Sequence, residues 1–135
     1  MAEDPALEAV GRFMEAVRRL DADAAAALVA ERYGCLVDTT VPLQLRRRRG
    51  RGPDGLRATL AEVARGWSSF EVDYSLERRG DAVLARGRYR ARHDGVGHES
   101  PFAALFELGA DGRLTAARVY GSLEAALADG APDRP

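Results

Sequence analysis

The chain has 135 residues, 46% of them hydrophobic and 30% charged, with a formal net charge of −1. This length predicts one domain over residues 1–135, with frayed ends at about 1–4 and 130–135, and the apolar fraction excludes a mainly disordered chain. The balanced charge argues against a general nucleic-acid binder, and no apolar run approaches the ~20 residues that a membrane span needs.

The composition also favours a compartment and a source. The acidic start, residues 1–5, lacks the features of a signal peptide, and the single cysteine, Cys35, cannot form an internal disulfide, so we expect a cytoplasmic protein. All 20 basic residues are arginine, and lysine, asparagine and isoleucine are absent, as a GC-rich bacterial genome would explain. This coding bias lowers the weight of any single arginine as a functional signal.

The first half of the chain shows mainly helical spacing. Asp4 caps a predicted first helix over 5–20, because apolar residues recur there every three or four positions. An alanine-rich second helix is expected over 21–34, followed by a short strand over 36–41. A third helix is predicted over 54–65, with its apolar stripe on one side.

The second half reads as strands. Apolar and polar residues alternate over 70–77 and 83–92, a loop at about 93–97 leads to a strand over 99–108, and an Asp-Gly hairpin signal precedes the last strand, 114–120. A short helix is expected over 123–128. Helices followed by an antiparallel meander predict an α+β fold, with helices packed on one face of a curved, mostly antiparallel sheet.

Three short motifs carry a family resemblance. They are RGPDGLR at 51–57, which opens the third helix, DGRL at 111–114 and the closing LEAAL at 123–127. Together with the order of elements over 7–129, they resemble the NTF2-like superfamily and in particular its SnoaL-like branch. The resemblance implies a cone that encloses a pocket and commonly dimerises through the outer face of the sheet. The superfamily includes ketosteroid isomerases, limonene-epoxide hydrolases, polyketide cyclases and proteins that only bind or scaffold, so the fold leaves function open.

The ketosteroid-isomerase pattern points to three positions. In that pattern a strand aspartate removes a proton beside a carbonyl, while a tyrosine and a protonated aspartate hold the enolate oxygen. Asp38 lies where the base belongs, so it is the predicted catalytic residue; the alternative is a strand-edge aspartate paired with a backbone amide or an arginine. The tyrosine position matches Phe13, and the second aspartate matches a position near Pro101. Because each missing oxyanion donor typically costs ~3–4 kcal/mol, efficient steroid-type isomerisation is not expected.

Other catalytic patterns of the superfamily are incomplete. The epoxide-hydrolase pattern needs an arginine and an aspartate two apart on one strand, and here that spacing occurs at Arg92 and Asp94, in a predicted turn. It also needs an aspartate on the last strand, and residues 114–120 contain no acid. The late-strand acid of the aldol-type cyclases is likewise not visible.

Aromatic side chains lie on the stripes that should face the interior of the cone. Phe13, Trp67, Tyr74 and Tyr89 are predicted to line a pocket for a flat or polycyclic ligand, with a tyrosine hydroxyl holding an oxygen. The alternative for each of them is ordinary core packing.

Polar candidates outside the pocket have simpler interpretations. The arginines over 86–92 alternate onto the opposite face, where we expect them to pair with acids of the neighbouring strand. The arginine run at 46–51 predicts a solvated loop or a contact for a phosphate or an acidic carrier protein. His93 and His98 flank a glycine turn, where His98 with Glu99 is a weaker acid/base alternative. No metal-ligand spacing appears, and neither a metal nor a cofactor is predicted.

One strand is apolar on both faces, since Phe102 and Phe106 alternate with Ala103 and Leu105. If the helices of one chain cover one face only, a second subunit must cover the other, which predicts a homodimer through the outer face.

Two functions remain open at this point. The first is a cofactor-free enzyme of bacterial secondary metabolism, in which Asp38 shuttles a proton during an isomerisation, cyclisation or dehydration of an apolar carbonyl or polyketide-like molecule. The second is a non-catalytic binding or accessory protein with the same pocket. Neither involves nucleic acid or a membrane.

Overall fold

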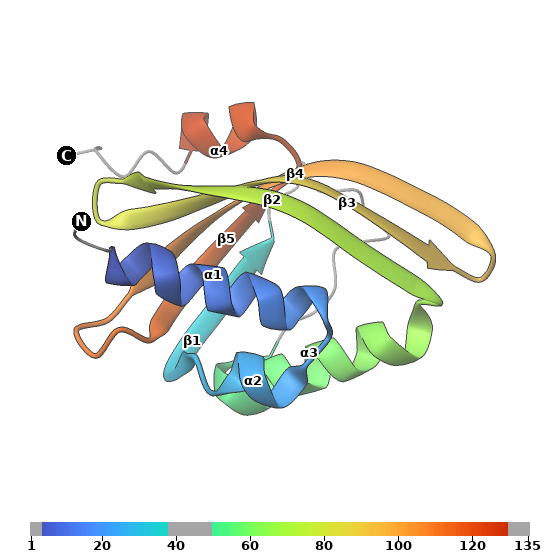
Figure 1. Ribbon diagram of the computed structural model, residues 1–135, viewed down its shortest axis with the longest axis horizontal. Helices are drawn as coiled ribbons and strands as arrows, with labels where there is room; N and C mark the ends of the chain where they lie inside the picture. The colour runs from blue at the N-terminus through green and yellow to red at the C-terminus, as the bar shows by residue number, and fades with distance from the viewer. Residues whose placement is uncertain (1–3, 38–49, 130–135) are drawn as a thin grey trace.

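A curved five-stranded sheet with helices on both sides organises the computed structural model, which describes residues 4–37 and 50–129 (Figure 1). Neighbouring strands are antiparallel, except that the first strand runs parallel to the last, and the spatial order is β1-β5-β4-β3-β2. The strands are β1 (Val29–Val37), β2 (Ser69–Arg79), β3 (Ala82–His93), β4 (Val96–Leu108) and β5 (Leu114–Tyr120). The predicted α+β fold with a mostly antiparallel sheet is therefore confirmed.

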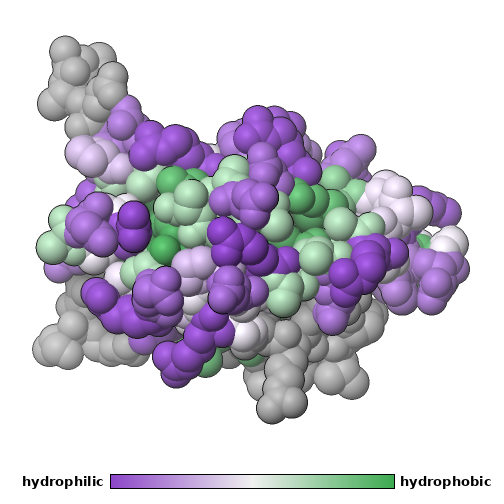
Figure 2. Space-filling model, turned by 90° about the horizontal axis from the view of Figure 1, so that it is seen from below, coloured by the Kyte–Doolittle hydropathy of each residue, from purple (hydrophilic) through white to green (hydrophobic). Residues whose placement is uncertain are grey.

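Within the described residues, four helices flank the sheet, three on its concave side and one on its outer side (Figure 1). They are α1 (Pro5–Arg18), α2 (Ala22–Ala26) and α3 (Gly52–Gly66) on the concave side and α4 (Leu123–Asp129) on the outer side. Seen from the helical side, hydrophobic residues gather along the middle of this face, with hydrophilic ones around and between them (Figure 2). No helix in the described ranges is long and apolar enough to cross a membrane.

The start of α1 follows the prediction closely. Pro5 opens the helix, and the Asp4 carboxylate accepts the backbone N–H groups of Ala6 at 3.0 Å and Leu7 at 3.5 Å. An aspartate cap followed by proline satisfies free donors of the first turn and presets the helical φ angle.

The second helix ends earlier than predicted. It stops at Ala26, and β1 begins at Val29, so Tyr33 lies in a strand. Alanine favours helix, but pairing with β5 and burial of Tyr33 to 4% exposure outweigh that weak local preference. The predicted strand thus starts well before residue 36, and its expected end at 41 lies outside the described residues.

The turn between β3 and β4 is tighter than the predicted loop. Asp94 and Gly95 both have positive φ, 53° and 77°, as a two-residue hairpin turn of the type I′ kind requires. Asp-Gly is a strong sequence signal for such turns, and β4 consequently begins at Val96.

Two apolar clusters stabilise the fold, one on each face of the sheet. The larger lies between the concave face and the first three helices, and the smaller lies under α4. The smaller contains Leu84, Ala103, Leu105, Tyr120 and Ala126. The sequence-based premise that one chain covers a single face of β4 is therefore wrong, because α4 covers part of the other face. A homodimer stays a prediction.

Candidate functional site

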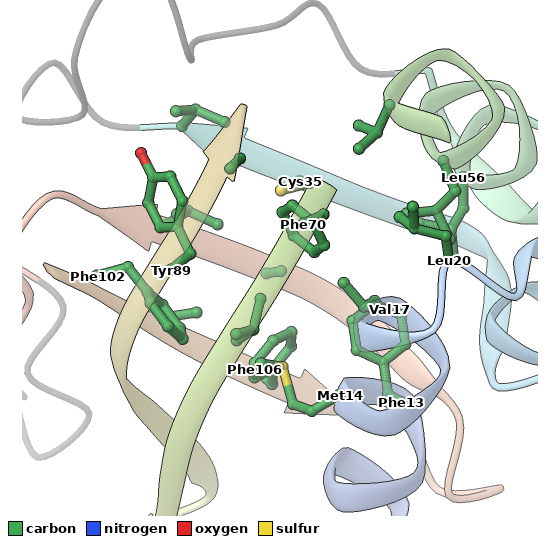
Figure 3. A pocket seen from close by; sticks show the side chains of 18 of the residues that line it. Phe13, Met14, Val17, Leu20, Cys35, Leu56, Phe70, Tyr89, Phe102 and Phe106 are labelled. Carbon is green, nitrogen blue, oxygen red and sulfur yellow. The ribbon is translucent and has the colours of Figure 1, made fainter. Parts of the chain in front are cut away.

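An apolar cavity of about 210 Å³ lies between the helices and the concave face (Figure 3). Helices α1 and α3 and all five strands line it, because alternate residues of each strand point to the same face of a sheet. Its aromatic lining residues are Phe13, Tyr33, Trp67, Phe70, Tyr89, Phe102 and Phe106.

The chemistry of this lining limits the ligand. Among the described residues that line the cavity, none has an ionisable acid, a histidine, an arginine or a lysine side chain. Their polar side-chain groups are the hydroxyls of Tyr33 and Tyr89, the thiol of Cys35 and the indole N–H of Trp67. Because burying an unpaired charge is costly, the lining fits an uncharged and mostly apolar molecule.

Phe13 lies in the wall that α1 contributes. Its ring makes an edge contact with Phe106, with centroids 5.5 Å apart, and a tilted contact with Tyr33 at 6.3 Å. The family resemblance assigns a tyrosine donor to this position. Phenylalanine supplies an apolar surface there and no hydrogen-bond donor.

Trp67 forms another part of the wall, directly after α3. Its backbone N–H donates to the carbonyl of Val63 at 2.9 Å, which ends the helix. Its indole contacts the imidazoles of His93 and His98, with ring centroids 5.2 and 5.5 Å apart. Trp67, the single tryptophan, therefore lies between the cavity and the two histidines of the chain.

The weaker acid/base alternative, His98 with Glu99, is not formed as a pair. Glu99 accepts a hydrogen bond from Arg88 at 3.2 Å on the outer face, whereas His98 contacts Trp67 on the concave face. Adjacent residues of a strand point to opposite faces, which separates the two side chains.

Tyr89 lines the cavity from β3. Its ring lies near Phe102, with centroids 6.5 Å apart, and its hydroxyl points away from the Phe102 and Phe106 rings (Figure 3). The hydroxyl oxygen is enclosed and has no hydrogen-bond partner among the described residues. Burial raises the pKa of this phenol, and the nearby Ser100 hydroxyl lowers it in part without reaching hydrogen-bond geometry.

Tyr74, also predicted for the pocket, is not among the lining residues. Its hydroxyl donates to Glu15 at 2.6 Å, which joins β2 to α1, and Glu15 also accepts from Arg18 at 2.6 Å. Burial first and then the Glu15 carboxylate raise the pKa of Tyr74 to about 12. The Arg18 guanidinium and then the Tyr74 hydroxyl lower the pKa of Glu15.

Pro101 also lies away from the cavity. It is exposed in β4 opposite Arg88 of β3, and Arg88 is on the outer face of the sheet. The neighbouring Phe102 points the other way and lines the cavity.

The predicted catalytic residue, Asp38, lies outside the described residues. The last described residue before it, Val37, ends β1 and lines the cavity. The arginine run at 46–51 lies almost entirely outside the described ranges as well.

Two lining residues of β1 are absent from the sequence-based prediction. Tyr33 and Cys35 point into the cavity together with Val37, and the predicted second helix extends over the first of them. The available signal was the alternation of these three apolar positions, which is typical of a strand.

The other catalytic patterns are no more complete in three dimensions. Arg92 donates to the carbonyl of Gly95 at 3.2 Å, and Asp94 lies 3.6 Å from His93, so this pair belongs to the exposed hairpin turn. β5 carries no acid. Within the described ranges no group of three or more His, Cys, Asp or Glu side chains could hold a metal ion.

The outer face of β3 is charged, as the alternation predicts. Arg88 pairs with Glu99 at 3.2 Å, and Arg90 pairs with Glu71 at 3.2 Å. A third arginine, Arg86, lies 3.9 Å from Glu77 of β2.

The fold and cavity define a class of α+β proteins in which helices close an apolar pocket against a curved sheet. The sequence profile of the SnoaL-like domain matches residues 10–117, and the chain belongs to this family. Among curated proteins, no sequence matches the chain.

Solved structures show the same fold. An LEH-like epoxide hydrolase of M. tuberculosis is 26% identical, with a TM-score of 0.66, and the match covers 86% of this chain and 81% of that one. A candidate SnoaL-like polyketide cyclase of Shewanella denitrificans OS-217 is 15% identical with a TM-score of 0.72, covering 87% and 90%. An NTF2-like protein of Burkholderia pseudomallei K96243 is 16% identical with a TM-score of 0.74, covering 93% and 97%.

Proposed function

We propose that the protein is a small-molecule enzyme that holds an uncharged, largely apolar carbonyl or polyketide-like substrate in the cavity and moves a proton on it. The supporting observation is the cavity itself, which is apolar and charge-free among the described residues. The reaction class is a cofactor-free isomerisation, cyclisation or dehydration.

The proposed chemistry needs one base. In this proposal Asp38 takes the proton next to the substrate carbonyl and returns it to another atom. The aromatic wall orients the substrate and excludes water.

Hydrolysis of an epoxide, the activity named for the M. tuberculosis structure, has less support in this chain. The acid that this pattern places on the last strand is missing from β5. The Arg92 and Asp94 pair lies at the exposed turn, and neither residue lines the cavity.

A specific observation favours a second candidate, a non-catalytic binding protein. The described lining holds no acid or base, and Phe13 has no hydroxyl where the resemblance assigns one. Such a protein would bind the same class of ligand and leave it unchanged.

Asp38→Asn separates these two functions, with Asp81→Asn, in the exposed turn after β2, as the matched control. Emission of Trp67 reports binding, since this single tryptophan lines the cavity, and NMR of a panel of aromatic ketones and polyketide-like molecules reports turnover. The enzyme predicts a loss of turnover of about 100-fold or more in Asp38→Asn, with binding retained and the control unchanged. Binding without turnover in the wild type would establish the second candidate. If no member of the panel shifts the emission, both are contradicted.

We also keep the homodimer, the cytoplasmic location and the weaker contact with an acidic carrier protein as predictions. Support for the dimer is the outer face of β2 and β3, where arginines and acids alternate and could pair with those of a second copy.

A further inference from the structure

The Tyr89 hydroxyl is a buried polar group that the described part of the chain does not satisfy. Its ring lines the cavity, and its oxygen is enclosed without a hydrogen-bond partner among the described residues. Buried hydroxyls are nearly always hydrogen-bonded in folded proteins, so an unsatisfied one needs an explanation.

No described neighbour lies in hydrogen-bond geometry with the Tyr89 hydroxyl. Ser100, directly opposite on β4, donates its own hydroxyl to the carbonyl of Pro101 at 2.9 Å, and its oxygen lies near the phenol without accepting from it in that geometry. The adjacent arginines, Arg88 and Arg90, point to the outer face and pair with acids there. No charged side chain of the described lining can therefore serve as the missing partner.

A second tyrosine shows that the fold can satisfy a phenol. The Tyr74 hydroxyl, on the neighbouring strand, donates to Glu15 at 2.6 Å and ties α1 to the sheet. Tyr74, outside the cavity, has a structural partner, whereas the hydroxyl of Tyr89, in the lining, has none among the described residues.

We infer that Tyr89 is a specificity-determining residue, whose hydroxyl donates a hydrogen bond to an acceptor oxygen of an uncharged ligand in the cavity. This inference rests on the proposed binding of small molecules there. It narrows the ligand to molecules with a carbonyl or similar oxygen on an apolar frame. A site with an unpaired buried donor discriminates against a hydrocarbon of the same shape, because the donor then stays unpaired.

A matched pair of probes tests this choice. α-Tetralone and tetralin share a bicyclic frame and differ in one carbonyl oxygen. Their dissociation constants are measured by isothermal titration calorimetry with the wild type, Tyr89→Phe and Tyr74→Phe, together with the thermal midpoint of each ligand-free protein. Tyr74→Phe is the matched control, because it removes the same hydroxyl outside the cavity.

The expected result is a preference of about tenfold for the ketone in the wild type, as one net hydrogen bond provides. In Tyr89→Phe this preference falls to about one, mainly through weaker ketone binding, while Tyr74→Phe keeps it. The thermal midpoint of Tyr89→Phe stays equal to that of the wild type or rises, whereas that of Tyr74→Phe falls. A purely structural role of Tyr89 would not produce this combination.

Equal binding of both probes by the wild type would overturn the role of Tyr89 and leave the proposed apolar site standing. Binding of neither probe would contradict the proposed site for this ligand size. The thermal midpoints of the ligand-free proteins would still show whether the Tyr89 hydroxyl has a partner within the protein. A fall in the midpoint of Tyr89→Phe as large as that of Tyr74→Phe would show that the hydroxyl already has a partner, which contradicts the inference.

Discussion

The two faces of the sheet are built from the same strands and differ in almost every physical property. On β3, Tyr89 and Ala91 point into the apolar cavity, whereas Arg88 and Arg90 between them point outward and pair with acids. The concave face holds the larger core and the candidate site. The outer face is charged, except where α4 covers a smaller apolar cluster. A strict period of two therefore places the cavity lining on one face and the ion-paired side chains on the other.

The largest effect is expected on the concave face. Phe106 is 3% exposed, packs on Phe13 and lines the cavity. Phe106→Ala removes that packing and enlarges the cavity, so the free energy of unfolding should fall by about 3–5 kcal/mol. Urea denaturation measures the loss, and Phe106→Leu, which keeps most of the volume, should lose much less. Equal losses would mean that the ring contributes little beyond an aliphatic chain.

A smaller loss is expected under α4. Leu84 is 1% exposed on the outer face and packs with Leu105 and Ala126. Leu84→Ala should lower the free energy of unfolding by about 2–3 kcal/mol, near the low end for buried leucines, because this cluster is small. Deleting α4 in the wild type and in Leu84→Ala gives the control. Without α4, Leu84→Ala should lower the free energy of unfolding much less, because the helix no longer covers the leucine. An undiminished loss in the protein without α4 would mean that the helix does not bury Leu84.

Tyr74 links the concave face to α1, and its effect should depend on pH. Its pKa is raised to about 12, above the ~10 of an unfolded tyrosine. The folded state therefore favours the neutral phenol, and this stabilisation is fully present below pH 10 and lost as the pH rises towards 12. Tyr74→Phe should be less stable than the wild type at pH 8, and the gap between them should narrow from pH 10 to 12. Denaturant midpoints measured across this range test it, and a constant gap would contradict it.

The sequence predicted well what depends on local periodicity. The Asp4 cap, the end of α3 at Gly66, one residue past the predicted 65, and the arginine row of β3 all follow from short-range patterns, and so do the inward positions of Phe13 and Tyr89. Such patterns involve neighbours within a turn of helix or along one strand.

Long-range contacts account for what the sequence did not predict. The first residues of β1 resemble a continued alanine-rich helix, and only their pairing with β5, some 80 residues away, makes them a strand. The hydrogen bond of Tyr74 with Glu15 joins residues 59 positions apart and keeps that tyrosine out of the lining. The cover that α4 gives to the outer face depends on how the end of the chain folds back. The predicted base, Asp38, lies outside the described residues.

The smallest effect on the stability of one chain is expected at the charged outer face. Arg88 and Glu99 are each about half exposed, 54% and 49%, at a distance of 3.2 Å. Exposed pairs contribute about 0–1 kcal/mol, so Arg88→Ala should shift the free energy of unfolding by less than about 1 kcal/mol and less still at high salt.

A second copy on this face would change that result, because an arginine enclosed between two subunits contributes more than an exposed one. Sedimentation velocity of wild type and Arg88→Glu, a charge reversal on that face, therefore tests the predicted dimer. A dimer that dissociates in Arg88→Glu and persists in Glu62→Arg, an exposed reversal on α3, would locate the interface on the outer face. A dimer unaffected by Arg88→Glu would place it elsewhere.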